Sequence, residues 1–457
     1  MKLLTITAGL SSLRGRANSY QESLIENLAN RGHHVSCILT ALVDSKPGAH
    51  AEMRVAPWDS NARIHEIFNA GVYPALYPQG GIGTREPLGD IQPSPWLRKM
   101  VLGIIEKEHP DAISYQSIFG LPFALIEEIN ASGVKAVFTV HDYFGVCPTA
   151  HLFRPDHTRC RLTGQELDCN LCCKDSPAFW AFWLRENLTH LGNQMSARPF
   201  LQQSIYRLRN VVQKMGQART PSAKGYSARR EAALRMLSSF TTLHCISDRQ
   251  KSVLLNLGVD ARNIALLPLI PPSITKVRPI RRLNQNEGNP TRFVALNIHG
   301  PYKGALLLSK TFKELEKAGF NYRLEIHGPE PQGFFKSTKI SIQGRYSLKD
   351  LDRISDRADF CLLPSIWDET LGFTAMEMLA RGVPLIASNC AGASQFVQCG
   401  ANGYVFNPED QDSLVNLLKK ICSPNSKNGG LAPEEKIPAG LKCYGEHIAD
   451  MEALLRN

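Results

Sequence analysis

A strand–helix–strand pattern begins twice in this chain, which sharply limits the folds available to it. The first occurrence comprises an apolar strand, a helix and a second strand, at 2–7, 19–30 and 35–39. The second occurrence has the same three elements at 292–297, 305–318 and 322–327. Strands that alternate with helices form mostly parallel sheets with helices on both faces. The sequence therefore predicts an α/β fold with two Rossmann-like domains.

A proline-rich segment separates the two patterns. Residues 268–290 contain prolines among charged residues and asparagine, a composition that does not continue a core element. The chain of 457 residues suits two domains of roughly 200 residues each. We predict an amino-terminal domain, a carboxyl-terminal domain and a final helix that rejoins the first domain, at 1–275, 276–439 and 440–457. Further strands are expected at 136–140, 241–246, 359–363 and 383–387.

The apolar runs of the chain are short. Residues 3–10 are apolar for about one strand before Arg14 and Arg16, which is too short for a secretory signal. No uninterrupted apolar run reaches the roughly 18 residues of a membrane span. Twelve cysteines without a regular framework favour a reducing compartment. We expect a cytoplasmic protein.

The positive charge is concentrated in one part of the chain. The formal net charge is +10, and residues 181–240 hold ten Lys or Arg against two Glu. A uniformly basic surface is typical of nucleic-acid binding, whereas one basic segment indicates a single docking face. No nucleic-acid partner is expected.

Two glutamates eight positions apart give the strongest indication of function. Glu369 and Glu377 lie in the stretch 364–377, which follows an apolar strand and is predicted to open a helix. Eight helical residues rise about 12 Å and rotate roughly 800°, which places both carboxylates on one side. A glycosidase acid/base pair needs about 5 to 9.5 Å, so two contacts along one extended ligand fit better. The backbone amides expected to face an anion such as diphosphate are those of Leu371, Gly372, Phe373 and Thr374.

This stretch resembles the E-x7-E signature of family 4 retaining glycosyltransferases. The segments 380–388 and 400–404 are also similar to that family. The resemblance implies a GT-B fold, in which an acceptor-side domain faces a nucleotide-sugar-binding domain across a cleft. It implies that Glu369 is a catalytic residue that contacts the hydroxyls of the donor sugar, and that Glu377 binds the ribose diol. The alternative is a solvated helix with incidental acids.

Lys303 lies in a Gly-Pro-Tyr-Lys-Gly segment between a strand and a helix. An ammonium group at this position can neutralise a diphosphate. The resemblance assigns Lys303 to that catalytic and donor-binding role. The family usually has an Arg a few residues earlier, where this chain has 297–299 as Asn-Ile-His. The second cation is therefore either missing or supplied by another residue.

Two further donor contacts are expected from the first domain. His141 follows the apolar strand 136–140, and the carboxyl end of a buried strand points into the cleft. The resemblance implies that His141 contacts the donor sugar near the reacting centre. The alternative is a core histidine whose hydrogen bonds are all made within the protein. Gly15 and Arg16 resemble the family's Gly-Gly turn near the donor phosphates. The Arg either loosens the approach of the donor or replaces an amide contact with its guanidinium group.

Five cysteines lie close together in the sequence, in a connection at 147–173 with little core of its own. A Cys-x2-Cys pair with two more thiols can close a tetrahedral zinc site and order such a loop. The predicted ligands of a structural zinc ion are Cys147, Cys160, Cys169 and Cys172, with Cys173 as an alternate. A reduced loop that binds nothing is the competing interpretation.

The basic segment begins with an aromatic run. Phe, Trp, Ala, Phe, Trp and Leu occupy 179–184, within a predicted helical insertion at 176–236. Aromatic residues beside clustered cations are typical of segments that contact an anionic membrane leaflet. We hypothesise peripheral contact with the inner face of a membrane or with a lipid-linked acceptor. In the alternative, the aromatic residues are core and the charges are solvated.

Together these features predict a hexosyltransferase. It would transfer a hexose-type sugar from a nucleotide-diphosphate sugar to an acceptor with retention, in cell-surface polysaccharide or glycolipid biosynthesis. The family analogy implies that the acceptor hydroxyl attacks on the face from which the nucleotide leaves and that a donor phosphate oxygen takes its proton. Lys303 and helix amides stabilise the departing charge, so no cofactor is required for catalysis. The alternatives are a sugar-nucleotide epimerase and a non-catalytic sugar-nucleotide-binding subunit.

Overall fold

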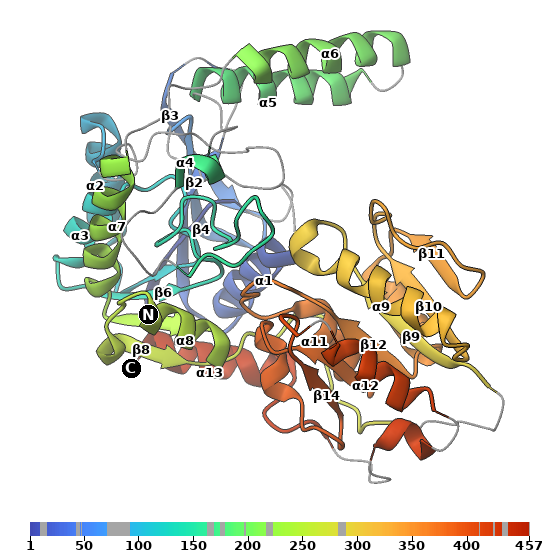
Figure 1. The fold of residues 1–457 in the computed structure, drawn as a ribbon. Coiled ribbons are helices and arrows are strands. Elements are labelled where there is room, and N and C mark those ends of the chain that lie inside the picture. Colours follow the sequence, from blue (N-terminus) through green and yellow to red (C-terminus); the bar gives the residue numbers. More distant parts are fainter. Residues whose placement is uncertain are drawn as a thin grey trace.

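The computed structural model describes two sheets flanked by helices (Figure 1). It describes residues 1–456, apart from 10–15, 43–45, 47, 71–91, 162–168, 174–178, 196–197, 216–222, 282–288, 411, 424–425 and 432–436. Within these ranges, the amino-terminal half forms one sheet and the carboxyl-terminal half forms the other.

The first sheet has eight described strands in the order β3-β4-β2-β1-β5-β6-β7-β8. All neighbours pair in parallel except β3 and β4, which form an antiparallel hairpin. Buried side chains occupy both faces of β1 from its second residue onward, as expected for a parallel strand covered on both sides. The strands are β1 (Lys2–Thr7), β2 (His34–Leu42), β3 (His50–Ala56), β4 (Asp59–Phe68), β5 (Ala112–Tyr115), β6 (Lys135–Thr139), β7 (Thr242–Cys245) and β8 (Ile264–Leu266).

The second sheet has six described strands in the order β11-β10-β9-β12-β13-β14, all parallel. The chain builds outward from β9 on one side and from β12 on the other. The order in which strands are added to the sheet therefore reverses between β9 and β12. In open α/β sheets, ligands bind outside the carboxyl ends of the strands at such a switch point. The strands are β9 (Thr291–Leu296), β10 (Tyr322–His327), β11 (Ile340–Gly344), β12 (Phe360–Leu363), β13 (Leu385–Ser388) and β14 (Gly403–Phe406).

The helices connect these strands. Those of the amino-terminal half are α1 (Arg16–Asn30), α2 (Pro95–Glu108), α3 (Phe123–Asn130), α4 (Cys169–Cys173), α5 (Phe179–Gln194), α6 (Pro199–Met215), α7 (Ala223–Ser238) and α8 (Asp248–Asn256). Those that follow are α9 (Ala305–Lys317), α10 (Leu351–Asp356), α11 (Phe373–Leu379), α12 (Ser413–Ile421) and α13 (Tyr444–Arg456). Short 3₁₀ helices lie at η2 (Ala261–Asn263), η3 (Pro301–Lys303), η4 (Leu348–Asp350), η5 (Gly392–Phe396) and η6 (Lys427–Gly430).

The last helix, α13, packs against the first domain. His447 Nε2 lies 2.8 Å from the Tyr20 hydroxyl on α1, and Glu452 forms an ion pair with Arg31 at 3.0 Å. Met451 and Leu455 are buried in a core that also contains residues of α1 and α11. The two halves therefore share a hydrophobic core in addition to the covalent connection between them.

Helices α5 and α6 form an antiparallel pair that projects from the first domain (Figure 1). In the view of Figure 1 they lie at the top, above β3 and α4, and run to the right above the second domain. No helix in the described ranges is both long enough and apolar enough to span a membrane.

Candidate functional site

The candidate site is a cleft between the carboxyl ends of the two sheets. A cavity of about 980 Å³ lies there, lined by loops that follow β6 and β7 of the first sheet and β9 and β12 of the second. The predicted site residues that line it are His141, Lys303, Glu369, Leu371, Gly372, Phe373 and Thr374. The structure thus brings together residues from both domains that are far apart in the sequence.

Lys303 reaches the site because two loops touch. Gly304 has a φ of 79°, and a Cβ atom at this position would lie 1.9 Å from the carbonyl oxygen of Pro364. Only glycine allows this approach between the loop after β9 and the loop after β12. As a result, Lys303 Nζ forms an ion pair with Glu369 Oε1. The same ammonium group lies 5.4 Å from the ring centroid of Trp367.

Glu369 is held firmly at the base of the cleft. Its backbone N–H donates to the Cys390 carbonyl at 3.0 Å, and its carbonyl accepts from Gly392 N–H at 2.9 Å. Its carboxylate accepts from Lys303 and from the Ser365 hydroxyl, and its side chain is 9% exposed. The carboxylate is therefore fixed and charge-compensated before any ligand binds. Sequence analysis did not identify Ser365 as its partner.

The predicted single helix that carries both acids is wrong. α11 begins at Phe373, so Glu369 lies four residues before it and bridges to Ala391. Gly372 has a φ of 105°, a conformation that favours glycine and that an α-helix does not contain. The break at Gly372 means that the expected helical spacing of about 12 Å does not apply.

The break at Gly372 leaves a run of backbone donors facing the cleft. In the described part of the chain, no acceptor pairs with the N–H groups of Leu371, Gly372, Phe373 and Thr374. All four residues line the cavity. Successive unpaired amides at the start of a helix are suited to binding an anion.

Glu377 lies deeper than the other predicted residues. It is 1% exposed, does not line the cavity, and accepts a hydrogen bond from the Ser273 hydroxyl at 2.6 Å. Ser273 belongs to the connection between the domains. Binding of a ribose diol by Glu377 stays a prediction, and it requires the Ser273 bond to open or to be shared.

His141 is a neutral imidazole in this environment. Burial, followed by nearby His244, lowers its pKa to about 3. Its Nε2 lies 3.0 Å from Gln116 Oε1, while Gln116 Nε2 donates to the hydroxyls of Ser114 and Thr139. Because the Gln116 oxygen must then accept, His141 donates through Nε2 and keeps Nδ1 as an acceptor. Gln116 was not predicted.

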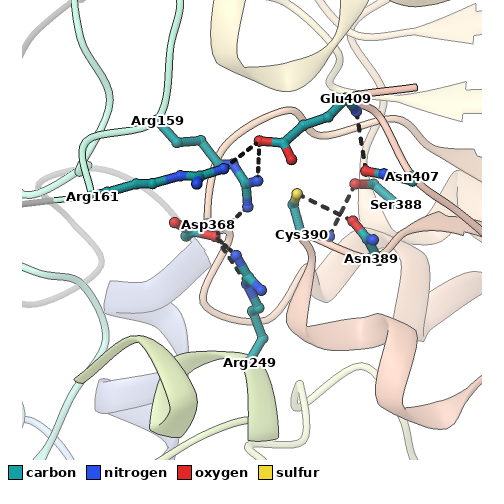
Figure 2. A network of polar contacts seen from close by, with 9 residues as sticks. All are labelled: Arg159, Arg161, Arg249, Asp368, Ser388, Asn389, Cys390, Asn407 and Glu409. Carbon is teal, nitrogen blue, oxygen red and sulfur yellow. Dashed lines mark hydrogen bonds and ion pairs between the residues drawn. The ribbon is translucent and has the colours of Figure 1, made fainter. Parts of the chain in front are cut away.

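A polar network joins the domains beside Glu369 (Figure 2). Arg249 on α8 donates from Nε to Asp368 Oδ1 at 2.9 Å, and Arg159 donates from Nη1 to the same oxygen at 3.2 Å. Arg159 also pairs with Glu409, as does Arg161 at 3.2 Å. Both arginines that contact Asp368 come from the first domain, while Asp368 and Glu409 belong to the second.

The next residue, Thr370, is bound by the first domain as well. Its hydroxyl donates to the His141 carbonyl at 3.0 Å, and its own carbonyl accepts from the Ser247 hydroxyl at 2.6 Å. Ser247 also caps α8 by accepting from Gln250 N–H at 3.1 Å. Glu369 is therefore flanked on both sides by residues that the first domain positions.

The remaining predicted site residues are only partly described. Gly15 lies outside the described residues. Arg16 is the first residue of α1, and its side chain also lies outside the description.

The cysteines of the 147–173 connection are free thiols. Burial raises the pKa of Cys169 and Cys172, and the neighbouring thiols of Cys147, Cys160 and Cys173 raise both further. Even so, no group of three or more His, Cys, Asp or Glu side chains among the described residues is arranged to hold a metal ion. The structural zinc ion stays a prediction, which elemental analysis of the purified protein tests.

Comparison with known proteins connects the second domain to sugar transfer. Residues 278–429 match the sequence family described as glycosyl transferases group 1. A lipopolysaccharide 1,2-N-acetylglucosaminetransferase of Salmonella typhimurium is 27% identical over 167 residues, which cover 33% of this chain and 43% of that protein. The chain matches between 24% and 43% of the length of its curated relatives.

Solved structures match the whole chain. Sucrose-phosphate synthase from Thermosynechococcus elongatus has a TM-score of 0.56 and 15% identity, covering 100% of this chain and 98% of that one. Anabaena HepE in complex with UDP and glucose has a TM-score of 0.53 and 13% identity, covering 100% and 99%. The fold is therefore α/β, with two Rossmann-like domains in the GT-B arrangement.

Proposed function

We propose that this chain is a retaining glycosyltransferase that moves a hexose-type sugar from a nucleoside-diphosphate sugar to an acceptor. The observation that carries the proposal is the ion pair of Lys303 and Glu369 beside four amides that have no acceptor among the described residues, in a cleft that His141 lines from the other domain. A sugar diphosphate needs cations and N–H donors for its phosphates and polar side chains for its hydroxyls. The cleft offers both within one cavity.

The diphosphate binds to Lys303 and to the amides of residues 371–374 at the start of α11. An ammonium group has three donors, so Lys303 can keep its bond to Glu369 and donate to a phosphate oxygen as well. Glu369 then contacts the hydroxyls of the donor sugar, and Glu377 the ribose diol. This arrangement agrees with the E-x7-E signature of family 4 enzymes that the sequence resembles.

The reaction exchanges one C–O bond for another. The bond from the anomeric carbon to the diphosphate oxygen breaks while the acceptor oxygen bonds to the same carbon on the same face. The acceptor proton moves to the departing phosphate oxygen. Lys303 and the amides stabilise the negative charge that develops on the diphosphate, and preorganised donors of this kind are a large part of catalysis. Neutral His141 hydrogen-bonds the sugar near this carbon.

Relatives support the class of substrates. One relative transfers N-acetylglucosamine in lipopolysaccharide, another is a sulfoquinovosyl transferase, and a structural neighbour binds UDP with glucose. We propose a nucleoside-diphosphate hexose as donor and a saccharide or glycolipid destined for the cell surface as acceptor.

The test is incubation with a panel of UDP-, GDP- and ADP-sugars, with nucleotide release measured in the presence and absence of candidate acceptors. Glu369→Gln should lower kcat by about 100-fold or more, because it removes a fixed charge at the reacting sugar. Glu314→Gln is a matched control, because Glu314 also pairs with a lysine, but on the solvent-exposed side of α9. The anomeric configuration of the product, followed by NMR, tests retention.

Three results would contradict the proposal. Wild-type turnover by the Glu369→Gln enzyme would contradict the assignment of the active site. A product with inverted anomeric configuration would contradict the retaining mechanism. A donor that is epimerised without an acceptor would place the chain in another enzyme class.

A further inference from the structure

Helix α6 presents an apolar face to solvent. Phe200 is 85% exposed, which is unusual for a phenylalanine, and Leu201, Leu208 and Val211 are each about half exposed. At 100° per residue these four side chains fall within an arc of about 100° on the helix surface. A helix of a globular domain ordinarily turns such a stripe toward the core. Here the stripe faces outward.

The outward orientation is fixed by the packing of α6 against α5. A Cβ atom at Gly192 would lie 2.6 Å from the Tyr206 ring, so the two helices approach closely there. Gln202 Nε2 donates to the Gly192 carbonyl at 3.1 Å, and the Tyr206 hydroxyl donates to Asn193 at 2.8 Å. Val212 is buried at 7% exposure. These contacts occupy the inner side of α6, and the apolar stripe lies outside them.

The charges around the stripe are positive. The sequence of α6 contains no Asp or Glu, and Arg207 lies next to Phe200 at one edge of the stripe. Arg198 precedes the helix and is exposed, as is Arg207. A helix with aromatic and aliphatic residues on one face and cations beside them binds in the headgroup region of an anionic bilayer.

The position of the helix pair suits contact with a flat surface. α5 and α6 project from the first domain at the top of Figure 1, beyond β3 and α4. We propose that the α6 face docks on an anionic membrane surface. Phe200 and the three aliphatic side chains enter the headgroup region, and Arg198 and Arg207 bind lipid phosphates. The proposal does not depend on the reaction proposed above.

The test is co-flotation of the full chain with two kinds of vesicle. One consists of phosphatidylcholine alone, and the other contains about one third phosphatidylglycerol. We expect binding to the anionic vesicles that weakens as salt increases. The double substitution Phe200→Ser with Leu208→Ser should lower the partition coefficient at least tenfold, because it removes two large apolar side chains from the face that enters the headgroup region. Leu348→Ser is the matched control, since Leu348 is 50% exposed on the second domain.

Charge is tested separately. Arg198→Gln with Arg207→Gln should remove the preference for anionic vesicles, whereas Lys349→Gln, exposed on the second domain, should not change it. Circular dichroism verifies that each variant is folded. Failure of the wild-type chain to bind anionic vesicles at low salt would overturn the proposal. So would a wild-type dimer that Phe200→Ser with Leu208→Ser dissociates in the absence of lipid, because the face would then bind a second copy.

Discussion

His141 and Gln116 show how one side chain sets the chemistry of another. Gln116 uses its amide nitrogen for Ser114 and Thr139, so its oxygen selects the His141 tautomer that is protonated at Nε2. Burial keeps the ring neutral, with a pKa of about 3. His141 therefore offers the cleft an uncharged imidazole whose Nδ1 can accept a hydrogen bond.

The lowered pKa of half-buried His141 should make the protein sensitive to acid. Its pKa in the folded state lies below the value of about 6.5 for an unfolded chain, so the unfolded state binds more protons between about pH 6.5 and pH 3. The free energy of unfolding should fall as the pH falls through this window, by up to about 1.4 kcal/mol per pH unit from this residue. Urea unfolding at several pH values should give a shallower slope for His141→Gln. Identical slopes would contradict the neutral state.

Three of the cleft residues were predicted from the sequence because they lie in loops that follow apolar strands. His141, Lys303 and Glu369 come after apolar strands, and parallel strands bring their carboxyl ends to one edge. Gln116 and Ser273 were missed because their importance lies in partners 25 and 104 positions away. Such pairings depend on strand order and on the path of the connection, which periodicity does not reveal.

The loops after β9 and β12 act together because their strands are neighbours. β9 and β12 pair in parallel, and the loops continue in contact where Gly304 meets Pro364. This contact carries Lys303 to Glu369. The pairing of the two strands therefore determines the distance between the cation and the acid.

Gly304→Ala should disturb this contact. Its Cβ would lie 1.9 Å from a carbonyl oxygen, and its φ of 79° is unfavourable for alanine. Gly319→Ala is the matched control, with a φ of 73° and open space around the site. We expect Gly304→Ala to be less stable than the control by about 1 to 3 kcal/mol, because only Gly304 adds overpacking to the backbone strain. Thermal unfolding and donor KM check this, and equal effects of both substitutions would contradict it.

Element prediction succeeded where the apolar pattern was long and failed where one residue changed the backbone. The expected strands and helices at 2–7, 305–318 and 322–327 match β1, α9 and β10 closely. The helix expected across Glu369 and Glu377 fails because Gly372 has a positive φ. The hairpin of β3 and β4 was not predicted. Six of the seven β3 residues are not buried, so the strand lacks a continuous apolar pattern.

The two domains are held together by charge as well as by apolar contact. Asp368 is 9% exposed and accepts from two arginines of the first domain. Arg159 comes from the same connection that contains the cysteines. That connection is therefore part of the domain interface, a role that its composition did not indicate.

Removal of both arginines should lower the free energy of unfolding more than removal of both arginines together with the charge of Asp368. Arg159→Gln with Arg249→Gln leaves Asp368 buried without a partner, at a cost of about 3 to 5 kcal/mol. Adding Asp368→Asn to that pair should restore most of the loss. Arg31→Gln, which breaks an exposed pair with Glu452, should cost about 1 kcal/mol or less. Urea unfolding measures all four proteins, and a triple variant no more stable than the double one would contradict this account.

The two-domain architecture followed from repetition of the strand and helix pattern. The arrangement of the domains did not, because it depends on contacts such as Arg249 with Asp368, which lie 119 positions apart. No local pattern in the sequence encodes a pair of that kind.

Three consecutive residues receive their bonds from alternate sides of the cleft. Asp368 and Thr370 are tethered to the first domain, while Glu369 between them is bonded within the second. Because Asp368 and Thr370 are the immediate neighbours of Glu369, no flexible residue lies between their contacts and this acid. Any rotation of one domain against the other would therefore act on both neighbours of Glu369 at once.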